Sequence, residues 1–236
     1  MRKYGKKYKD ALKSIADKPM YNLTEAVKLL KETSGTKFDS TAEVHLNLNI
    51  DPKQADQIVR STVMLPHGTG KKLKIAAVTT DEKVKIAKDA GATAAGLEDL
   101  IEEFKKGKFN YDIVVATPDV MKNLAKVAKI LGQKGLMPNP KSGTVTHDLG
   151  KTIEELGRGR IEIKNDKDGN VHSIFGKVSF KEDELENNLR TLLRTMRDAK
   201  PSGIKGTYIQ SITVTTTMGP GIKLSVNEVM GSLSKE

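Results

Sequence analysis

Hydroxyl side chains are the groups with the clearest chemistry in this sequence, and they gather in residues 206–224. Successive side chains of an extended chain point to opposite faces. A strand here would carry on one face Ile209, Ser211, Thr213, Thr215 and Thr217, and on the other Tyr208, Gln210, Ile212, Val214 and Thr216. A hydroxyl both donates and accepts hydrogen bonds, so the first face suits a sugar–phosphate chain. The alternative is an edge strand in which the threonines serve β-propensity alone, and the residues by themselves leave both interpretations open.

The predicted strand ends at Met218-Gly219-Pro220-Gly221. Proline fixes φ and has no N–H, while each glycine permits positive φ, so the strand must stop or kink there. Small residues also leave the backbone open to a close approach. We therefore expect a nucleic-acid contact where the hydroxyl face meets this turn.

Composition favours the same class of partner. The chain has 236 residues, and its 40 Lys and Arg exceed its 30 Asp and Glu to give a net charge of +10, which favours a polyanion. The length allows one or two domains with ordinary cores. The absence of cysteine excludes disulfides and thiol catalysis. No apolar run reaches the length of a membrane span, so we expect a cytoplasmic protein with no membrane partner.

The motifs of enzymes and cofactor sites are missing. Residues 65–72, LPHGTGKK, have Leu65 where a P-loop needs glycine and Lys72 where it needs Ser or Thr. The turn Thr80-Asp81-Glu82-Lys83 after a predicted strand places acids where a dinucleotide phosphate would lie. We therefore expect no enzyme and no cofactor.

Metal binding and DNA recognition also lack a signature. The histidines have no metal-ligand spacing, so each is read as a surface or hydrogen-bonded residue: His45, His67, His147 and His172. A DNA-binding regulator is the other alternative, but no helix-turn-helix or zinc-finger spacing is visible.

The N-terminal half offers two further candidate contacts. Residues 1–13 form a basic arm that includes Arg2 and Lys3, and such arms often meet nucleic acid, although a solvated amphipathic helix explains them equally well. Lys37 and Phe38 precede residues 41–50, whose alternation predicts a half-buried strand. Phe38 is predicted either to stack on a base or to close the core.

Two glycine-containing segments, residues 66–68 and 157–159, predict the domain organisation. Between them the pattern is β/α, with strands at 73–79 and 112–116 and helices at 82–90, 97–106, 120–131 and 150–156. After them come a hairpin of residues 160–164 and 171–178 and a helix of residues 181–199. The predicted hinge residues are Pro66, His67, Gly68, Gly157 and Gly159.

The predicted fold is an α+β split domain carrying an inserted three-layer α/β Rossmann-like domain. The split domain, of the split β-α-β type with an antiparallel-rich sheet and helices, comprises residues 1–66 and 158–236. The insert, residues 67–157, has 15 basic and 12 acidic residues, against 25 and 18 in the split domain. The more basic split domain is the better electrostatic match for a nucleic acid.

Several blocks of sequence resemble one family, the bacterial-type first proteins of the large ribosomal subunit. The blocks cover nearly the whole chain in the family's order: residues 37–48 (KFDSTAEVHLNL), 65–71 (LPHGTGK), 114–121 (VVATPDVM), 135–145 (GLMPNPKSGTV), 200–208 (KPSGIKGTY) and 213–221 (TVTTTMGPG). The tail from about residue 227 falls outside the resemblance.

The resemblance implies a function. Members bind 23S ribosomal RNA at the mobile side stalk of the 50S subunit, and the stalk's swing accompanies release of deacylated tRNA from the exit site. They also repress translation of their own operon by binding its mRNA, and are monomers when free. The RNA contacts carried over are Lys37, Phe38, Thr41, Ser211, Thr215, Thr217, Met218 and Gly219, with Arg2, Lys3, Lys205 and Lys141 as additional candidates.

Overall fold

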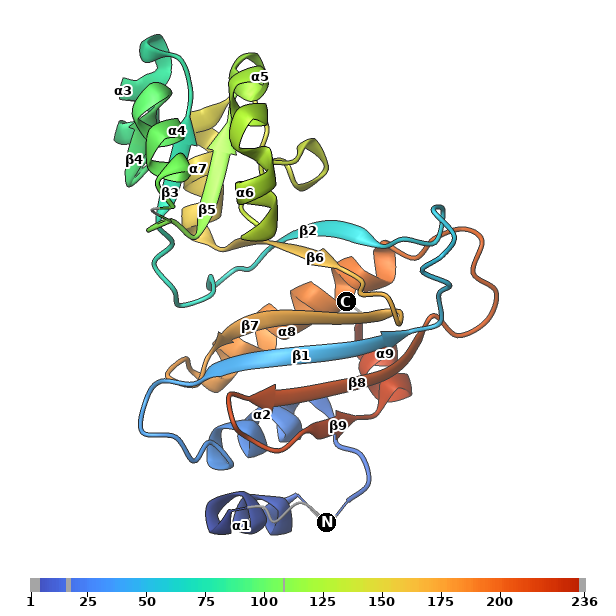
Figure 1. Ribbon diagram of the computed structural model, residues 1–236. Coiled ribbons are helices and arrows are strands. Elements are labelled where there is room, and N and C mark those ends of the chain that lie inside the picture. The colour runs from blue at the N-terminus through green and yellow to red at the C-terminus, as the bar shows by residue number, and fades with distance from the viewer. Residues whose placement is uncertain (1–4, 16–17, 108, 234–236) are drawn as a thin grey trace. The chain divides into compact units, whose positions relative to one another are not determined.

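The computed structural model describes residues 5–15, 18–107 and 109–233, and its chain divides into two compact units (Figure 1). Unit 1 is discontinuous and consists of Met1–Gly70 and Ile161–Glu236, while unit 2 is Lys71–Arg160. The boundaries predicted from the sequence lie a few residues away from these.

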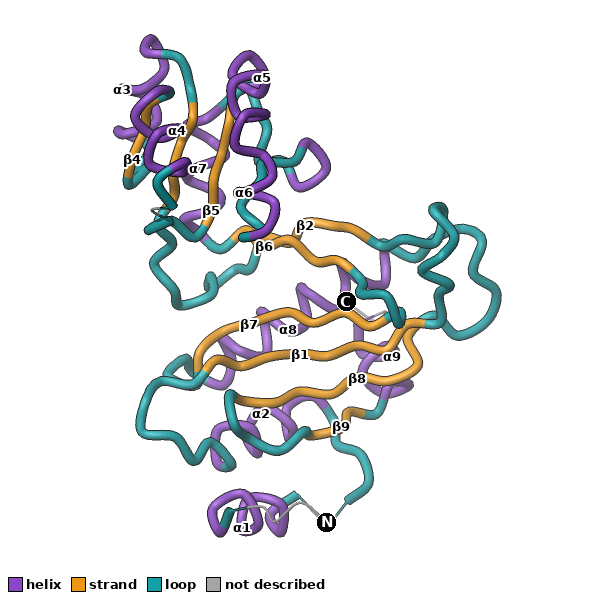
Figure 2. The backbone as a smooth tube through the Cα atoms, viewed as in Figure 1, coloured by secondary structure: helices purple, strands orange, loops and turns teal. Residues whose placement is uncertain are grey.

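Unit 1 is built on a four-stranded antiparallel sheet with the strand order β7-β1-β8-β9 (Figure 2). Its strands are β1 (Thr41–Leu48), β7 (Asn170–Lys177), β8 (Ile209–Thr216) and β9 (Ile222–Leu224). A separate two-stranded sheet joins β2 (Arg60–Met64) to β6 (Arg160–Lys164). Strands distant in sequence thus meet at the centre of this unit.

One face of the four-stranded sheet is buried under helices. Burial alternates along the whole of β1, as its sequence predicts, and the buried Val44 and Leu46 belong to one core with Leu189. The helices of this unit are α1 (Lys6–Ser14), α2 (Leu23–Glu32), α8 (Glu182–Asp198) and α9 (Val226–Leu233). The Asn22 side chain caps α2 by accepting a hydrogen bond of 2.8 Å from the Glu25 N–H. On the other face, which we call the open face, the alternate side chains of β1 remain partly exposed.

Unit 2 contains a three-stranded parallel sheet with the order β4-β3-β5. Its strands are β3 (Ile75–Val78), β4 (Ala94–Gly96) and β5 (Ile113–Ala116). Alternate side chains of β3 and β5 enter two separate cores, one shared with α3 (Asp81–Asp89) and α7 (Leu149–Arg158) and the other with α4 (Glu98–Lys105), α5 (Met121–Leu124) and α6 (Ala128–Gln133). Helices therefore cover both faces of this sheet.

The structure corrects some predicted elements. The single helix expected at residues 120–131 is instead a series of short 3₁₀ and α segments, η1 (Pro118–Val120), α5, η2 (Ala125–Val127) and α6. The hinge expected at Gly157 lies inside α7, and the chain leaves this helix at Gly159, whose φ of 112° fits a glycine C-cap. β4, β9 and α9 were not anticipated. No helix in the described ranges is both long and apolar enough to cross a membrane.

Candidate nucleic-acid interface

The start of β1 and the end of β8 form one rim of the unit 1 sheet. Thr217 N–H donates to the Thr41 carbonyl at 3.1 Å, and Thr41 N–H donates to the Thr217 hydroxyl oxygen at 3.1 Å. Antiparallel pairing therefore joins two of the predicted RNA contacts although they are far apart in sequence. We call the segments 36–41 and 215–220 the rim.

The two faces predicted for β8 are correct only for its second half. A register shift in the β1–β8 pairing places Asn47 opposite Ser211 and Leu48 opposite Ile209, so Gln210 is the extra residue of a bulge. As a result Ile209 is buried and Gln210 is exposed, the reverse of the simple alternation. Tyr208 is also buried, which raises the pKa of its hydroxyl to about 12 and removes it from any surface contact.

Phe38 is exposed, which excludes the alternative that it closes the core. Its side chain keeps 59% of its accessible surface. The loop beneath it is held by a hydrogen bond of 2.9 Å from the Thr36 hydroxyl to the Phe38 carbonyl and by two bonds from Ser179 to the Asp39 carboxylate. The ring is thus displayed to solvent on a fixed backbone.

Met218 is displayed in a similar way on the other side of the rim. It is 81% exposed and has φ of 67°, a conformation that no other non-glycine residue adopts in the described ranges. Gly219 N–H donates to the Thr216 carbonyl at 2.8 Å, and the Thr215 hydroxyl lies 3.2 Å from the Gly219 carbonyl. A Cβ on Gly219 would collide with the Thr216 hydroxyl oxygen, so this glycine is required by the turn itself as well as by any close approach of RNA.

The hydroxyls of the rim differ in what they still offer a ligand. Thr217 accepts from the Thr41 N–H, and Thr41 accepts from the Lys177 ammonium at 2.8 Å, so each keeps its own O–H to donate. The Thr215 proton is used inside the turn, which leaves only its oxygen as an acceptor. Two free donors beside the Lys177 ammonium, with Lys37 in the same rim, form a local site suited to phosphate oxygens.

Lys177 belongs to the candidate site although nothing in the sequence predicted it. It lies opposite Thr41 in the β1–β7 pairing, and its ammonium bonds Thr41 and, at 3.4 Å, the Asp39 carbonyl. Nothing in its local sequence signals this role, because the contact depends on pairing with a strand more than a hundred residues away.

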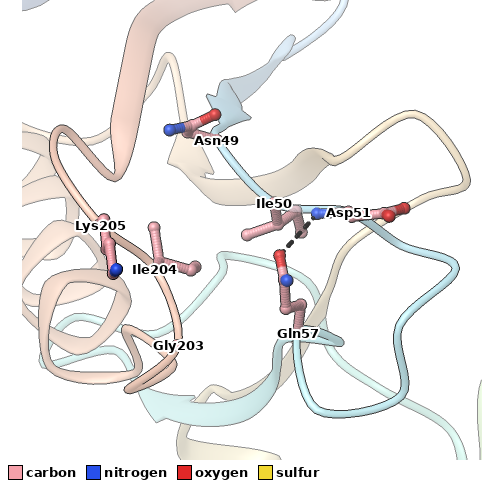
Figure 3. Close-up of a pocket in the computed structure, with 7 residues that line it drawn as sticks. All are labelled: Asn49, Ile50, Asp51, Gln57, Gly203, Ile204 and Lys205. Atoms are coloured by element: carbon pink, nitrogen blue, oxygen red, sulfur yellow. Dashed lines mark hydrogen bonds between the residues drawn. The ribbon is translucent and has the colours of Figure 1, made fainter.

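Other predicted contacts lie away from the rim. Ser211 is exposed on β8 opposite Asn47, near the other end of the strand. Lys205 lies beyond that end and lines a cavity of about 300 Å³ with Asn49, Asp51 and others, in which Gln57 accepts a hydrogen bond from the Asp51 N–H (Figure 3). Because β1 rises about 3.3 Å per residue, this cavity is roughly 23 Å from the rim along the strand.

Three predicted contacts cannot be grouped with the rim. Lys141 is exposed in unit 2, in a loop that Asn139 fixes by accepting a hydrogen bond of 2.8 Å from the Lys141 N–H. Arg2 and Lys3 lie outside the described residues.

The predicted hinge at Pro66, His67 and Gly68 is fastened to unit 1. Asn188, fully buried on α8, accepts from the His67 N–H at 3.0 Å and donates to the Gly68 carbonyl at 2.9 Å. A Cβ on Gly70 would lie 2.7 Å from Lys177 Cγ, so the chain passes very close to β7 there. The linker between the units therefore begins after Gly70.

The open sheet face brings together two histidines that are isolated in sequence. His45 and His172 are paired across β1 and β7, with their Nδ1 atoms 2.8 Å apart, and Glu43 and Asp166 lie 3.8 and 3.4 Å from their respective Nε2 atoms. Burial and the neighbouring His172 lower the pKa of His45. Among the described residues no group of three or more His, Cys, Asp and Glu is arranged to hold a metal ion.

Comparisons with known proteins agree with the resemblance seen in the sequence. The model of the ribosomal protein L1p/L10e family matches residues 30–220, which include the whole rim. The chain is 52% identical to large ribosomal subunit protein uL1 of Mesoplasma florum over 229 residues, which are 96% of this chain and all of that protein. It is 49% identical to the uL1 of Chloroflexus aggregans, over 96% of this chain and 97% of that protein, and 47% identical to that of Prochlorococcus marinus over the full length of both. With a rim of exposed aromatic, thioether and hydroxyl groups, and with these matches over nearly its full length, the chain belongs to the ribosomal protein L1p/L10e family.

Proposed function

We propose that this protein is a non-catalytic constituent of the large ribosomal subunit in the cytoplasm and binds 23S ribosomal RNA at the mobile side stalk. The observation that carries the proposal is the rim, where fixed loops present Phe38 and Met218 beside the free donors of Thr41 and Thr217. Proteins recognise RNA by stacking on unpaired bases and by contacts to ribose hydroxyls and phosphates, and the rim offers groups for each. The relatives' names as large-subunit proteins support the assignment.

The finer parts of the proposal follow from the family. We infer that movement of the bound stalk assists release of deacylated tRNA from the exit site, and that the free monomer represses its own operon by binding the mRNA. The same rim would serve both RNAs, because a messenger site that resembles the ribosomal one needs no second surface. We also propose that unit 2 is a Rossmann-like insert that takes no nucleotide. The parallel sheet covered on both faces supports its fold, and the glycine-free turn after β3 argues against a phosphate site.

Salt-dependent binding tests the RNA proposal. The probe is a transcript of the side-stalk segment of the organism's 23S rRNA, with a duplex of equal length and unrelated sequence as the control. If the protein neutralises Z phosphates, log affinity falls with log salt at a slope of roughly −0.7Z to −0.9Z, and the stalk transcript binds well above the control at every salt concentration. Equal affinity for both RNAs would contradict the proposal.

Competition tests repression. A transcript of the operon leader should displace the stalk transcript completely and with a single inhibition constant, because both occupy the rim. A reporter fused to that leader should be repressed by the wild-type protein and not by a Phe38→Ala variant. Simultaneous binding of both RNAs to one protein would overturn the shared-site model.

A further inference from the structure

A cavity of about 650 Å³ lies between the rim and helix α1. Its walls include Tyr8 and Ala11 from α1, Lys37 and Phe38 from one rim loop, and Met218 and Pro220 from the other. Figure 1 shows α1 at the edge of unit 1. The hydrogen bonds within the rim give no reason for a space of this size.

Two of the three walls are fixed. The loop before β1 is tied by the Thr36–Phe38 hydrogen bond and by a contact of 3.1 Å between the Ser34 and Ser40 hydroxyls. The turn after β8 holds Met218 at a positive φ, a conformation that persists only where the surroundings impose it. Contacts and backbone conformation within unit 1 thus hold both walls in place.

The third wall, α1, is less buried than the core helices of unit 1: Tyr8, Ala11 and Leu12 are partly buried, and Ile15 at its C-cap packs against the core. None of its nine residues is buried, and the Lys7 ammonium reaches the Gly35 carbonyl at only 3.5 Å, the outer limit of a hydrogen bond. A helix that buries little apolar surface is easily displaced, because burial is what stabilises most helices in proteins. Of the three walls, α1 is the one that can move.

The lining fits a single nucleotide. The rings of Tyr8 and Phe38 and the Met218 thioether provide apolar surface for a flat base, and Lys7 and Lys37 bring positive charge for its phosphate. The volume falls within the range of about 300–1,000 Å³ that is typical of sites for small molecules. Stacking on aromatic side chains is how proteins hold RNA bases that have left their helix.

We propose that one unstacked nucleotide of the bound RNA enters this cavity, and that α1 moves to admit it and then covers it. The inference rests on the proposed RNA-binding function and names a site within it. In this proposal α1 contributes to RNA recognition by forming a wall of the cavity, and not only by its positive charge.

Filling the cavity tests occupancy. Ala11→Trp places a large ring in the space without changing charge, and Ser14→Trp puts the same ring on the exposed side of α1 as the matched control. Ala11→Trp should weaken binding of the stalk transcript by roughly five- to 150-fold, the effect of losing one stacked base, with an unchanged salt slope. Ser14→Trp should bind like the wild type. Equal affinity of the two variants would overturn the proposal, whereas failure of the wild type to bind the transcript would instead reject the RNA-binding function.

Locking α1 tests its movement, and the cysteine-free chain makes this simple. A Cβ on Gly35 would lie 4.0 Å from the Lys7 Cβ, within the range of about 3.5–4.5 Å that a disulfide spans. In the Lys7→Cys, Gly35→Cys variant, oxidation before RNA is added should slow association by at least about tenfold, and oxidation after binding should slow dissociation. The reduced form of the same variant is the control. Association at the same rate in the oxidised and reduced forms would exclude a moving α1.

Discussion

The two sheets of this molecule differ in what they leave uncovered. In unit 1 every second side chain of β1 remains partly exposed, because helices pack on one face only. In unit 2 all four residues of β3 are buried, because helices cover both faces. A sheet covered on both sides can offer a partner only its loops and edges. The open sheet can also offer a face and a rim, which is why the RNA site is proposed in unit 1.

The open face is polar, and its side chains are held by contacts with one another. His45 pairs with His172, and the Asn47 side-chain amide donates to Asn170 at 2.8 Å. Cross-strand pairs of this kind hold the side chains in register, so the face is ordered before any partner arrives. The corresponding positions of β3 and β5 are small or branched apolar residues that serve the cores alone.

Separating the two units is the strongest test of this difference between their sheets. A protein that joins residues 1–70 to 161–236 through a short flexible linker should fold and keep most of its affinity for the stalk transcript, since the whole rim lies in unit 1. Isolated residues 71–160 should bind at least roughly 100-fold more weakly, as expected for non-specific contacts. Circular dichroism and binding titrations of both proteins provide the measurement. Strong, selective binding by unit 2 would reverse the comparison.

Adjacent threonines at the end of β8 provide the next test. Thr217→Val should weaken RNA binding by about 1–3 kcal/mol, or roughly five- to 150-fold, because a donor to RNA is lost. It should also lower the melting temperature, because the Thr41 N–H loses its acceptor.

Thr216→Val is the matched control for that experiment. The Thr216 hydroxyl is buried and has no hydrogen-bond partner, so its removal should leave RNA affinity unchanged and keep or raise the melting temperature. If Thr216→Val weakened RNA binding as much as Thr217→Val does, the assignment of the free donor to Thr217 would be wrong.

Lysine substitutions compare the units by charge. Lys37→Gln should reduce the salt slope of binding by about 0.7–0.9, since one phosphate contact is lost. Lys122→Gln, at an exposed site in unit 2 that is not among the predicted contacts, removes the same charge and should leave the slope unchanged. Equal effects on the slope would bring unit 2 into the interface.

The smallest expected effect concerns pH and the open face. The pKa of His45 is lowered in the folded protein, so the unfolded chain binds more protons as pH falls below the ordinary histidine pKa of about 6.5. Stability should therefore decline on acidification through that value, and His45→Gln should flatten this part of the curve of unfolding free energy against pH. His147→Gln, at an exposed histidine of unit 2, is the control for a histidine-to-glutamine change away from this face. A His45→Gln curve parallel to the wild type would exclude the proposed cost of protonating His45.

Local patterns predicted much of unit 1. The alternation of residues 41–50 predicts β1 to within two residues. The apolar residues spaced along the predicted helix 181–199 lie on the buried face of α8: Leu185, Leu189, Leu192, Leu193 and Met196. Elements of three residues, such as β4 and β9, are too short for periodicity to mark them. The bulge at Gln210 also escapes a local reading, because it is defined by pairing with β1 and not by its own sequence.

The sequence predicted only part of the site, because strand pairing brings some of its residues together. Residue types and the family blocks led to Phe38, Thr217 and Met218, which the structure brings to one rim. Lys177 was missed because only strand pairing places it beside Thr41. The exposure of Phe38 could not be read from its sequence either, since an aromatic residue before a strand packs inward as readily as it points to solvent.

The discontinuity of unit 1 has a consequence for how the protein is made. Residues 71–160 emerge as one continuous block, and β3, β4 and β5 form a sheet of their own, so this block can fold while the chain is still growing. β1 is synthesised earlier but must wait for β7 and β8, and Thr41 meets Thr217 only when about nine-tenths of the chain has left the translating ribosome. A nascent chain that is interrupted before that point lacks half of the rim. If the rim binds RNA as proposed, such incomplete copies would lack half of the site.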